Sequence, residues 1–309
     1  MQSAQASTEE PLYSIGAVER DTGLTKDTLR VWERRYGFPT PVRDANGERV
    51  YSREQVAKLR TLKRLLDRGH RPGRIIGRSL AELVALADAA PAAAPEPVLA
   101  EAPARILALL REHRVAELRE ELGQSLMRQG LAGFVTETVA PLNRAVGDAW
   151  MRGQIEVFEE HLYTETMQGV LRGAIASIPQ HGRPPRVLLT TLPNEQHHLG
   201  LLMAQAMFTL EGATAISLGT QTPIFDIVLA AASHRADVVA LSFSSAYPTV
   251  QVADGLEELR AKLPRAVELW AGGTNAGLRR RDLTGVRICD TLEAIAPALA
   301  EWRAAAAAA

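Results

Sequence analysis

The chain has 309 residues, of which 46% are hydrophobic, so it is long enough to bury the cores of two or three domains. Its formal net charge of −1 is unevenly spread, because Leu12 to Leu80 carry sixteen Lys and Arg against eight Asp and Glu. This basic module predicts a polyanionic partner for that part of the chain alone. The single cysteine, Cys289, excludes an internal disulfide framework, and no apolar run reaches the ~18 residues that span a bilayer. With no signal-peptide profile at the N-terminus, we expect a soluble, cytoplasmic protein.

Composition and periodicity divide the chain into five segments. We expect residues 1–11 to be disordered, 12–81 to form a DNA-binding domain, 82–104 a linker rich in Ala and Pro, 105–180 a helical bundle and 181–309 an α/β domain. The last six residues are all Ala and follow a predicted terminal helix.

The N-terminal module has the pattern of a helix-turn-helix. In YSIGAVERDTGLTKDTLRVWERRYGF (13–38), the turn DTGLT separates two short helices, with Gly23 in the turn and Thr25 as the expected cap of the second helix. That helix carries four basic side chains on its expected exposed face: Lys26, Arg30, Arg34 and Arg35. Arginine suits bidentate contacts with guanine edges and phosphates. The module therefore predicts binding to double-stranded DNA.

A predicted β-hairpin follows the second helix. The Asn46-Gly47 turn in PVRDANGERVYS (41–52) is flanked by Arg43 and Arg49, which indicates a basic wing beside the DNA backbone. Each arginine taken alone would more often be a solvated surface residue. The combination TLRVWERRYGFPTPVR…GERVYS resembles the DNA-binding domain of MerR-family transcription regulators. The resemblance implies binding to pseudo-palindromic operators as a dimer or a larger symmetric assembly.

The rest of the chain changes periodicity near residue 180. From 105 to 178, apolar residues recur at three- and four-residue spacing, as in Phe134, Leu142 and Val146, which indicates helices. From 186 to 303, five short apolar runs alternate with helix-length segments: RVLLTT, ATAISL, DVVALSF, AVELWAG and VRICD. The predicted fold class is multidomain α and α/β, with a winged helix-turn-helix, a four-helix bundle and a Rossmann-like doubly wound parallel sheet.

The segment NEQHHLG (194–200) places a carboxylate and two imidazoles directly after the first predicted strand. Adjacent histidines point in different directions on a helix, and the only cysteine is remote in sequence, which argues against a closed zinc site. A polar loop without a ligand is the simplest interpretation. Such a loop still lies at the carboxyl edge of the sheet, where ligands bind in open α/β folds.

The spacing Glu195-x-His197-x-x-Gly200 resembles the E/D-x-H-x-x-G motif of cobalamin-binding domains. The resemblance implies that His197 is the lower axial ligand of cobalt, oriented by Glu195, and that Gly200 leaves room for the corrinoid; His198 is expected to be peripheral. It also implies a slot for the nucleotide tail lined by small residues after the third and fourth strands. LSFSS (241–245) and AGG (271–273) occupy those places, giving Ser242, Ser244, Gly272 and Gly273.

In the helical segment, Trp150 is followed after nine residues by Glu160 and His161. This spacing resembles the W-x9-E-H motif of cobalamin-dependent photoreceptor regulators, the CarH/LitR group, and implies that these residues surround the upper cobalt ligand. Alone, Trp150 would more often be a core residue and the Glu-His pair a helix surface. Met151 departs from the group, whose well-known members have a histidine there that can approach cobalt after illumination.

Together these segments predict a light-responsive transcription regulator that is not an enzyme, with adenosylcobalamin or another cobalamin as cofactor. The resemblance implies a repressor that oligomerises on DNA in the dark, as a dimer or tetramer, and leaves it when light breaks the cobalt–carbon bond. One alternative is a regulator that senses another tetrapyrrole or a protein partner. A corrinoid enzyme component is disfavoured because no segment is long enough for a substrate-activating module.

Overall fold

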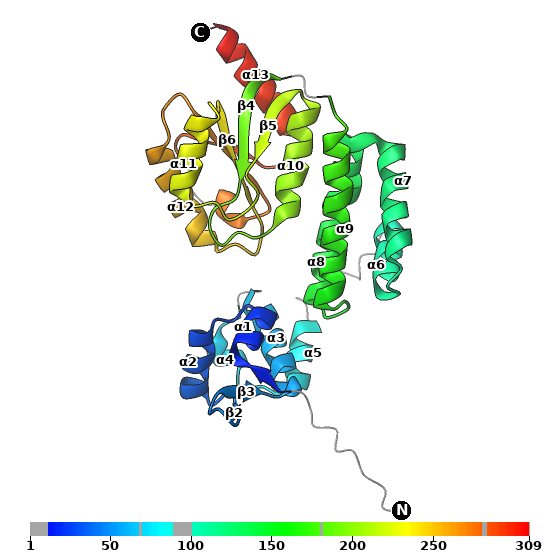
Figure 1. Ribbon diagram of the computed structural model, residues 1–309, viewed down its shortest axis with the longest axis vertical. Helices are drawn as coiled ribbons and strands as arrows, with labels where there is room; N and C mark the ends of the chain where they lie inside the picture. The colour runs from blue at the N-terminus through cyan, green and yellow to red at the C-terminus, as the bar shows by residue number, and fades with distance from the viewer. Residues whose placement is uncertain (1–11, 68–69, 89–100, 180–181, 280–282, 309) are drawn as a thin grey trace, which may run out of the picture. The chain divides into compact units, whose positions relative to one another are not determined.

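The computed structural model in Figure 1 describes residues 12–67, 70–88, 101–179, 182–279 and 283–308. The expected disorder of residues 1–11 falls outside these ranges. The chain forms two compact units, Met1–Val98 and Leu99–Ala309, and each is described by itself.

The first unit contains a three-stranded antiparallel sheet and five helices. Its elements are β1 (Tyr13–Ser14), α1 (Ile15–Thr22), α2 (Lys26–Tyr36), β2 (Val42–Arg43), β3 (Arg49–Tyr51), α3 (Arg53–Asp67), α4 (Pro72–Ile75) and α5 (Leu80–Asp88). Gly23 ends α1 with a left-handed φ of 69°, and the Thr25 side chain accepts a hydrogen bond from the Thr28 amide at the start of α2. The predicted helix-turn-helix and the cap at Thr25 are confirmed.

The wing is an antiparallel hairpin in which Val42 pairs with Val50 and Arg43 with Arg49. Gly47 has a φ of 78°, which the turn requires and glycine adopts without strain. Behind the wing and α2, a core of buried side chains holds the unit together, including Leu29, Trp32 and Tyr51. The N-terminal unit is a winged helix-turn-helix, as the sequence predicts.

The predicted linker over 82–104 is too long. Helix α5 continues to Asp88 and buries Leu83 in the core of the first unit, while α6 of the second unit begins at Glu101. Alanine has the highest helix propensity, so an Ala-rich segment can extend a helix as well as a linker. The rest of the predicted linker, 89–100, lies outside the described residues.

The second unit begins with helices. They are α6 (Glu101–Arg111), α7 (Val115–Gly133), the π-helical turn η1 (Phe134–Val139), α8 (Ala140–Met151) and α9 (Val157–Ala176). Gly130 has φ 68° and ψ 169°, so it breaks the helical path near the end of α7. Helix α9 starts with a capping box in which the Glu159 carboxylate accepts a 2.6 Å hydrogen bond from the Glu156 amide.

A five-stranded parallel sheet with surrounding helices completes the second unit. The elements are β4 (Arg183–Thr190), α10 (His198–Leu210), β5 (Ala213–Ser217), α11 (Ile224–Ser233), β6 (Val238–Phe243), α12 (Thr249–Lys262), β7 (Glu268–Gly273), the 3-10 turn η2 (Ala276–Arg279), β8 (Val286–Cys289) and α13 (Ile295–Ala308). The strand order is β5-β4-β6-β7-β8. From β4 the chain goes first to β5 on one side of β4 and then returns to β6 on the other side. The carboxyl ends of β4 and β6 therefore form a topological switch point.

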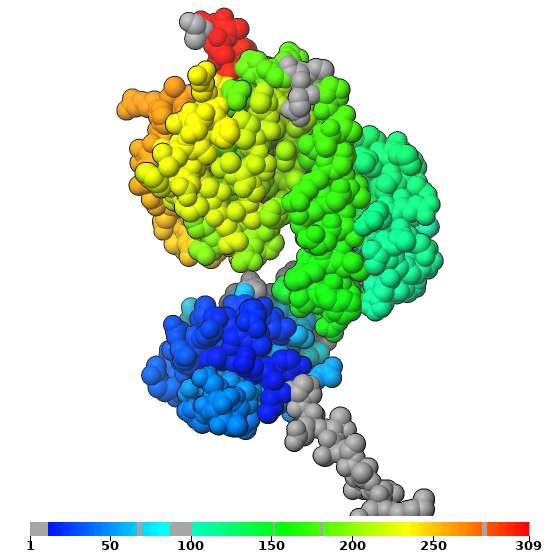
Figure 2. Space-filling model, viewed as in Figure 1, coloured from blue at the N-terminus to red at the C-terminus, as the bar shows by residue number. Residues whose placement is uncertain are grey.

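The two faces of the sheet belong to different cores. Alternate residues such as Leu188 and Val239 face α11 and α12 in one core. Their neighbours, such as Leu189 and Val238, join α10, α13 and all the bundle helices in the other. The bundle therefore shares a core with the sheet and packs through α9 against α10, an arrangement visible on the surface in Figure 2. The sequence predicts a boundary near residue 180, whereas the structure joins both segments in one compact unit.

Candidate functional site

A buried carboxylate lies at the switch point, in the loop between β4 and α10. Asn194 turns this loop with a left-handed φ of 69°. The buried Thr191 hydroxyl donates to the Glu195 carbonyl at 2.7 Å and accepts from the Gln221 amide at 2.8 Å, which ties this loop to the one after β5. These bonds fix the backbone at Glu195, and only 1% of the surface of this residue is exposed.

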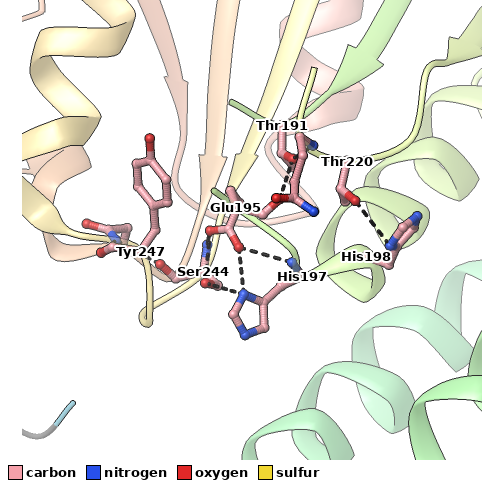
Figure 3. Close-up of polar contacts among 9 residues, drawn as sticks. Thr191, Glu195, His197, His198, Thr220, Ser244 and Tyr247 are labelled. Carbon is pink, nitrogen blue, oxygen red and sulfur yellow. Dashed lines mark hydrogen bonds and ion pairs between the residues drawn. The ribbon is translucent and has the colours of Figure 1, made fainter. Parts of the chain in front are cut away.

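Glu195 accepts hydrogen bonds at both oxygens, as Figure 3 shows. Its Oε1 lies 2.6 Å from Nδ1 of His197 and accepts from the His197 amide at 3.1 Å. Its Oε2 accepts from the amide and the hydroxyl of Ser244, at 2.8 and 2.9 Å. Burial would raise the pKa of Glu195, but the hydrogen bonds with His197 and Ser244 outweigh burial and lower it. This carboxylate is ionised in the folded protein at neutral pH.

His197 is the N-cap residue of α10, and its ring has two different environments. Nδ1 faces Glu195 and also lies 2.9 Å from the Ser244 hydroxyl oxygen. The side chain is nevertheless 59% exposed, and among the described residues Nε2 makes no hydrogen bond. The Glu195 hydrogen bond raises the pKa of His197 against the effect of burial. An imidazole held at Nδ1 by a carboxylate can offer its Nε2 lone pair to a metal ion.

His198 points away from His197 in Figure 3. Its Nδ1 lies 3.4 Å from the Thr220 hydroxyl oxygen, in the loop that follows β5. The two adjacent histidines therefore face different loops.

Small residues lie next to the site on the α10 side of the sheet. Ser242 pairs with Gly272, and Gly272 pairs with Cys289, in one row across β6, β7 and β8. A Cβ atom on Gly200 would come within 2.7 Å of the Ser242 hydroxyl oxygen, so α10 lies close to β6 at this glycine, and a larger residue would require the Ser242 side chain to move. The space at Gly200, which the resemblance implies is open for the corrinoid, is thus partly filled by the Ser242 side chain.

At position 273, glycine is required by packing within the sheet and not by an open slot for a ligand. Its φ is 124°, and a Cβ atom there would lie 2.1 Å from the Phe243 carbonyl oxygen. The Thr274 amide donates to the same carbonyl at 3.0 Å. Glycine at 273 is therefore required for the close approach of the ends of β6 and β7.

One predicted residue of the bundle acts on His197 through its charge. Glu160, in the first turn of α9, contributes to the raised pKa of His197 through its negative charge. Its Oε1 accepts from the Thr164 hydroxyl at 2.7 Å, and its Oε2 lies 3.7 Å from Nε2 of His161, whose side chain is 72% exposed. Trp150 packs, partly buried, against the core shared by bundle and sheet. Met151 is the last residue of α8.

The six predicted DNA-contact residues of the first unit divide into two groups. Lys26, Arg30, Arg34, Arg35 and Arg43 are exposed on α2 and the wing. Arg49 is half-buried, and its Nε donates to Glu33 at 2.9 Å, which ties the wing to α2. The sequence does not reveal this ion pair, which links residues far apart along the chain. The exposed Arg71, Arg74 and Arg78, in and beside α4, add positive charge that the sequence pattern alone does not assign to DNA binding.

Asn275 and Thr191 are further residues of the site, and no sequence motif indicates them. Both lie just beyond a strand, and their side chains bond to backbone groups of a neighbouring loop. Their position after the strands is the one signal that could have indicated them.

Comparisons with known proteins agree with this architecture. Residues 13–78 match the model of the MerR HTH family regulatory protein, and two models of a B12 binding domain match residues 103–172 and 185–299. The HTH-type transcriptional repressor CarH of Myxococcus xanthus is 32% identical over 86% of this chain and 90% of its own length. The repressor CarA of the same organism is 29% identical, over 90% of this chain and 93% of its own.

Among solved structures, the monomethylamine corrinoid protein of Methanosarcina barkeri has a TM-score of 0.52 and 16% sequence identity. The match covers 64% of this chain and 96% of that chain, and it supports the fold.

The chain belongs to the family of MerR-type transcription regulators with B12-binding domains that includes CarH and CarA. It is a DNA-binding, cobalamin-binding regulator and not an enzyme. Within the described parts of the chain, no helix is both long enough and apolar enough to cross a membrane.

Proposed function

We propose that this protein is a light-responsive repressor that binds adenosylcobalamin, with His197 as the lower axial ligand of cobalt. The observation that carries the proposal is the Glu195–His197–Ser244 cluster at the switch point, in which Nδ1 is held by hydrogen bonds and Nε2 is left for a ligand. A single protein nitrogen would be sufficient, because a bound corrin would supply the other nitrogen ligands of cobalt itself. The beginning of α10 and the row Ser242–Gly272 would receive the corrin and its nucleotide tail.

The bundle residues would act on the other side of cobalt. The negative charge of Glu160 helps to raise the pKa of His197, which supports a position of the first turn of α9 near the same ligand. On this proposal Trp150, Glu160 and His161 cover the upper ligand, and Glu160 contributes the polar contact. When bound, adenosylcobalamin supplies a cobalt–carbon bond that visible light cleaves. The shared core of bundle and sheet offers a route from a changed upper ligand to a changed position of α9.

In the dark, the loaded protein would oligomerise and bind its operator in the cytoplasm through α2, the wing and the α4 arginines. Illumination would separate the assembly and lower its affinity for DNA, because a dimer or tetramer contacts several half-sites at once and a monomer contacts one. The domain limits that serve this function are 12–88 for DNA binding and 101–308 for cobalamin binding.

The test is reconstitution with adenosylcobalamin in darkness, followed by absorption spectroscopy, gel filtration and mobility shift on duplex DNA selected from a random pool. The expected result is a protein-bound corrinoid spectrum, a larger species in the dark and loss of the shifted DNA band after illumination. Identical elution and identical DNA binding in both light states would contradict a light-responsive function. A protein that retains a different tetrapyrrole from cell extract and not adenosylcobalamin would support the alternative sensor.

A further inference from the structure

Asn275 is a buried amide in the loop that follows β7, with 3% of its surface exposed. Its Nδ2 donates to the carbonyl oxygens of Ser244 and Tyr247, at 2.7 and 2.8 Å, and its Oδ1 accepts from the Gly277 amide at 2.8 Å. The opposite orientation of the amide would face an oxygen toward two carbonyls and an NH2 group toward an N–H. The bonding partners therefore fix the orientation of this side chain.

The two carbonyls that Asn275 holds belong to the turn after β6. Within that turn, the Tyr247 amide donates to the Ser244 carbonyl at 3.3 Å, a long distance for such a bond. The bonds from Asn275 are shorter and come from a different strand connection. Asn275 thus contributes much of what holds the turn in place.

The same turn presents Ser244 to the carboxylate that orients His197. Both the amide and the hydroxyl of Ser244 donate to Oε2 of Glu195, and the hydroxyl oxygen also lies 2.9 Å from Nδ1 of His197. If the turn shifted, Glu195 would lose two donors at once and the imidazole would lose a neighbour. Asn275 lies one step behind these contacts and touches neither His197 nor Glu195 through any hydrogen bond found among the described residues.

We infer that Asn275 is a positioning residue, which holds the Ser244–Tyr247 turn so that Glu195 and Ser244 fix the His197 ring for cobalt ligation. The inference rests on the proposed function, in which His197 is the cobalt ligand. It concerns a residue that does not contact the ligand itself. Loss of the amide donors should lower the fraction of cobalamin bound through His197 while leaving the fold intact.

Asn275→Asp is the sharpest variant, because the carboxylate keeps an acceptor for Gly277 and loses both donors to the turn. Asn143→Asp is the matched control: Asn143 accepts from Tyr163 and donates to Met203 in the same unit, away from this turn. Protein labelled with 15N-histidine would be loaded with cob(II)alamin and examined by electron paramagnetic resonance. Ligation by labelled histidine splits the lines into doublets, whereas the unlabelled base of the cofactor itself gives triplets.

The wild type should show doublets. For Asn275→Asp we expect the ratio of histidine-ligated to self-ligated cobalamin to fall about tenfold, at the lower end of the effect of groups that orient metal ligands. Asn143→Asp should keep the wild-type ratio, and both cofactor-free variants should still unfold in a single cooperative transition, with Asn275→Asp melting at the lower temperature.

Each other outcome has a distinct meaning. Triplets in the wild type would overturn the proposed cobalt ligand and, with it, the role of Asn275. Doublets in the wild type and an unchanged ratio in Asn275→Asp would overturn the positioning role alone. If Asn275→Asp does not fold, Asn275→Ser is the second variant. If neither folds, or if Asn143→Asp lowers the ratio equally, the effect belongs to the stability of the unit and the inference is wrong.

Discussion

Oε1 of Glu195 lies 2.6 Å from Nδ1 of His197, and the carboxylate is buried while the imidazole is largely exposed. The buried Glu195 carboxylate therefore fixes the orientation of the exposed His197 ring. A carboxylate in this place sets the tautomer of the ring, with the proton on Nδ1 and a lone pair on Nε2. This tautomer leaves a lone pair on Nε2, which a histidine needs in order to bind a metal ion through that nitrogen.

The first prediction follows from that pair. In Glu195→Gln an NH2 group replaces one acceptor oxygen, so it repels either Ser244 or His197, and cobalamin affinity should fall about 10–100-fold. His197→Ala should abolish ligation by protein nitrogen. Visible absorbance titration in darkness measures both effects. Glu257→Gln, at an exposed position of α12, should bind like wild type. Wild-type affinity and spectrum in His197→Ala would exclude this residue as the ligand.

A second prediction separates two arginines of the DNA-binding unit. Arg34 is exposed on α2, so Arg34→Ala should weaken binding to selected duplex DNA and flatten the log–log salt dependence by about one unit. Arg49 is paired with Glu33, so Arg49→Ala should mainly loosen the wing, with ~1 kcal/mol or less lost in stability. Its salt slope should remain that of wild type. Mobility shifts at several salt concentrations test the contrast, and equal slopes for all three proteins would contradict the Arg34 contact.

The third prediction concerns the close approach of β6 and β7. Gly273→Ala would place a methyl group 2.1 Å from the Phe243 carbonyl oxygen at a φ of 124°, so the free energy of unfolding should fall by at least about 3 kcal/mol. Gly123→Ala is the control, because this helical glycine in α7 has open space around it. That variant should gain roughly 0.5–1 kcal/mol. Denaturant unfolding measures both, and a stable Gly273→Ala variant would show that the ends of the strands can separate.

Much of this architecture is readable from the sequence. The five apolar runs are the five strands, and the Thr25 cap and the Asn46-Gly47 turn lie where local chemistry puts them. These features depend on neighbours in sequence, which is why local patterns predict them.

Other features depend on residues distant in sequence. The Arg49–Glu33 pair and the bonds of Asn275 join segments that only the fold brings together. The same holds for the common core of bundle and sheet, which periodicity divides into two domains. The extent of α5 was missed for a different reason, since alanine is compatible with both helix and linker.

A fourth prediction concerns Cys289, whose thiol is buried at the end of β8. Burial raises the pKa of Cys289 to about 11 from an ordinary value of 9.0. At neutral pH, alkylation by iodoacetamide should be about 100-fold slower in the folded than in the unfolded protein, because the thiolate is scarcer. Because the folded protein holds the thiol proton more tightly than the unfolded chain does, the protonated thiol contributes to the stability of the fold. This contribution is fully present below pH 9 and is lost as pH rises toward 11. Equal alkylation rates in the presence and absence of denaturant would contradict the burial.

The last prediction tests whether the bundle acts on the ligand site. The negative charge of Glu160 helps to raise the pKa of His197, so Glu160→Gln should lower it in the cofactor-free protein. The amide oxygen can still accept from Thr164, which leaves the first turn of α9 intact. Glu165→Gln, at an exposed position on the same helix, should leave the pKa of His197 unchanged. NMR titration of the His197 ring protons measures these values.

The same two variants then separate electrostatic proximity from function. A raised folded pKa means that the contribution of protonated His197 to stability is present at low pH and is lost as pH rises through that pKa; in Glu160→Gln this loss should be smaller and should be complete at a lower pH. Loaded with adenosylcobalamin, Glu160→Gln should also show a smaller difference in gel filtration between dark and light than Glu165→Gln does. If the His197 pKa falls while assembly responds to light as in wild type, Glu160 lies near the ligand and takes no part in coupling. If the pKa does not change, the first turn of α9 does not face His197, and a cap built from this helix would be wrong.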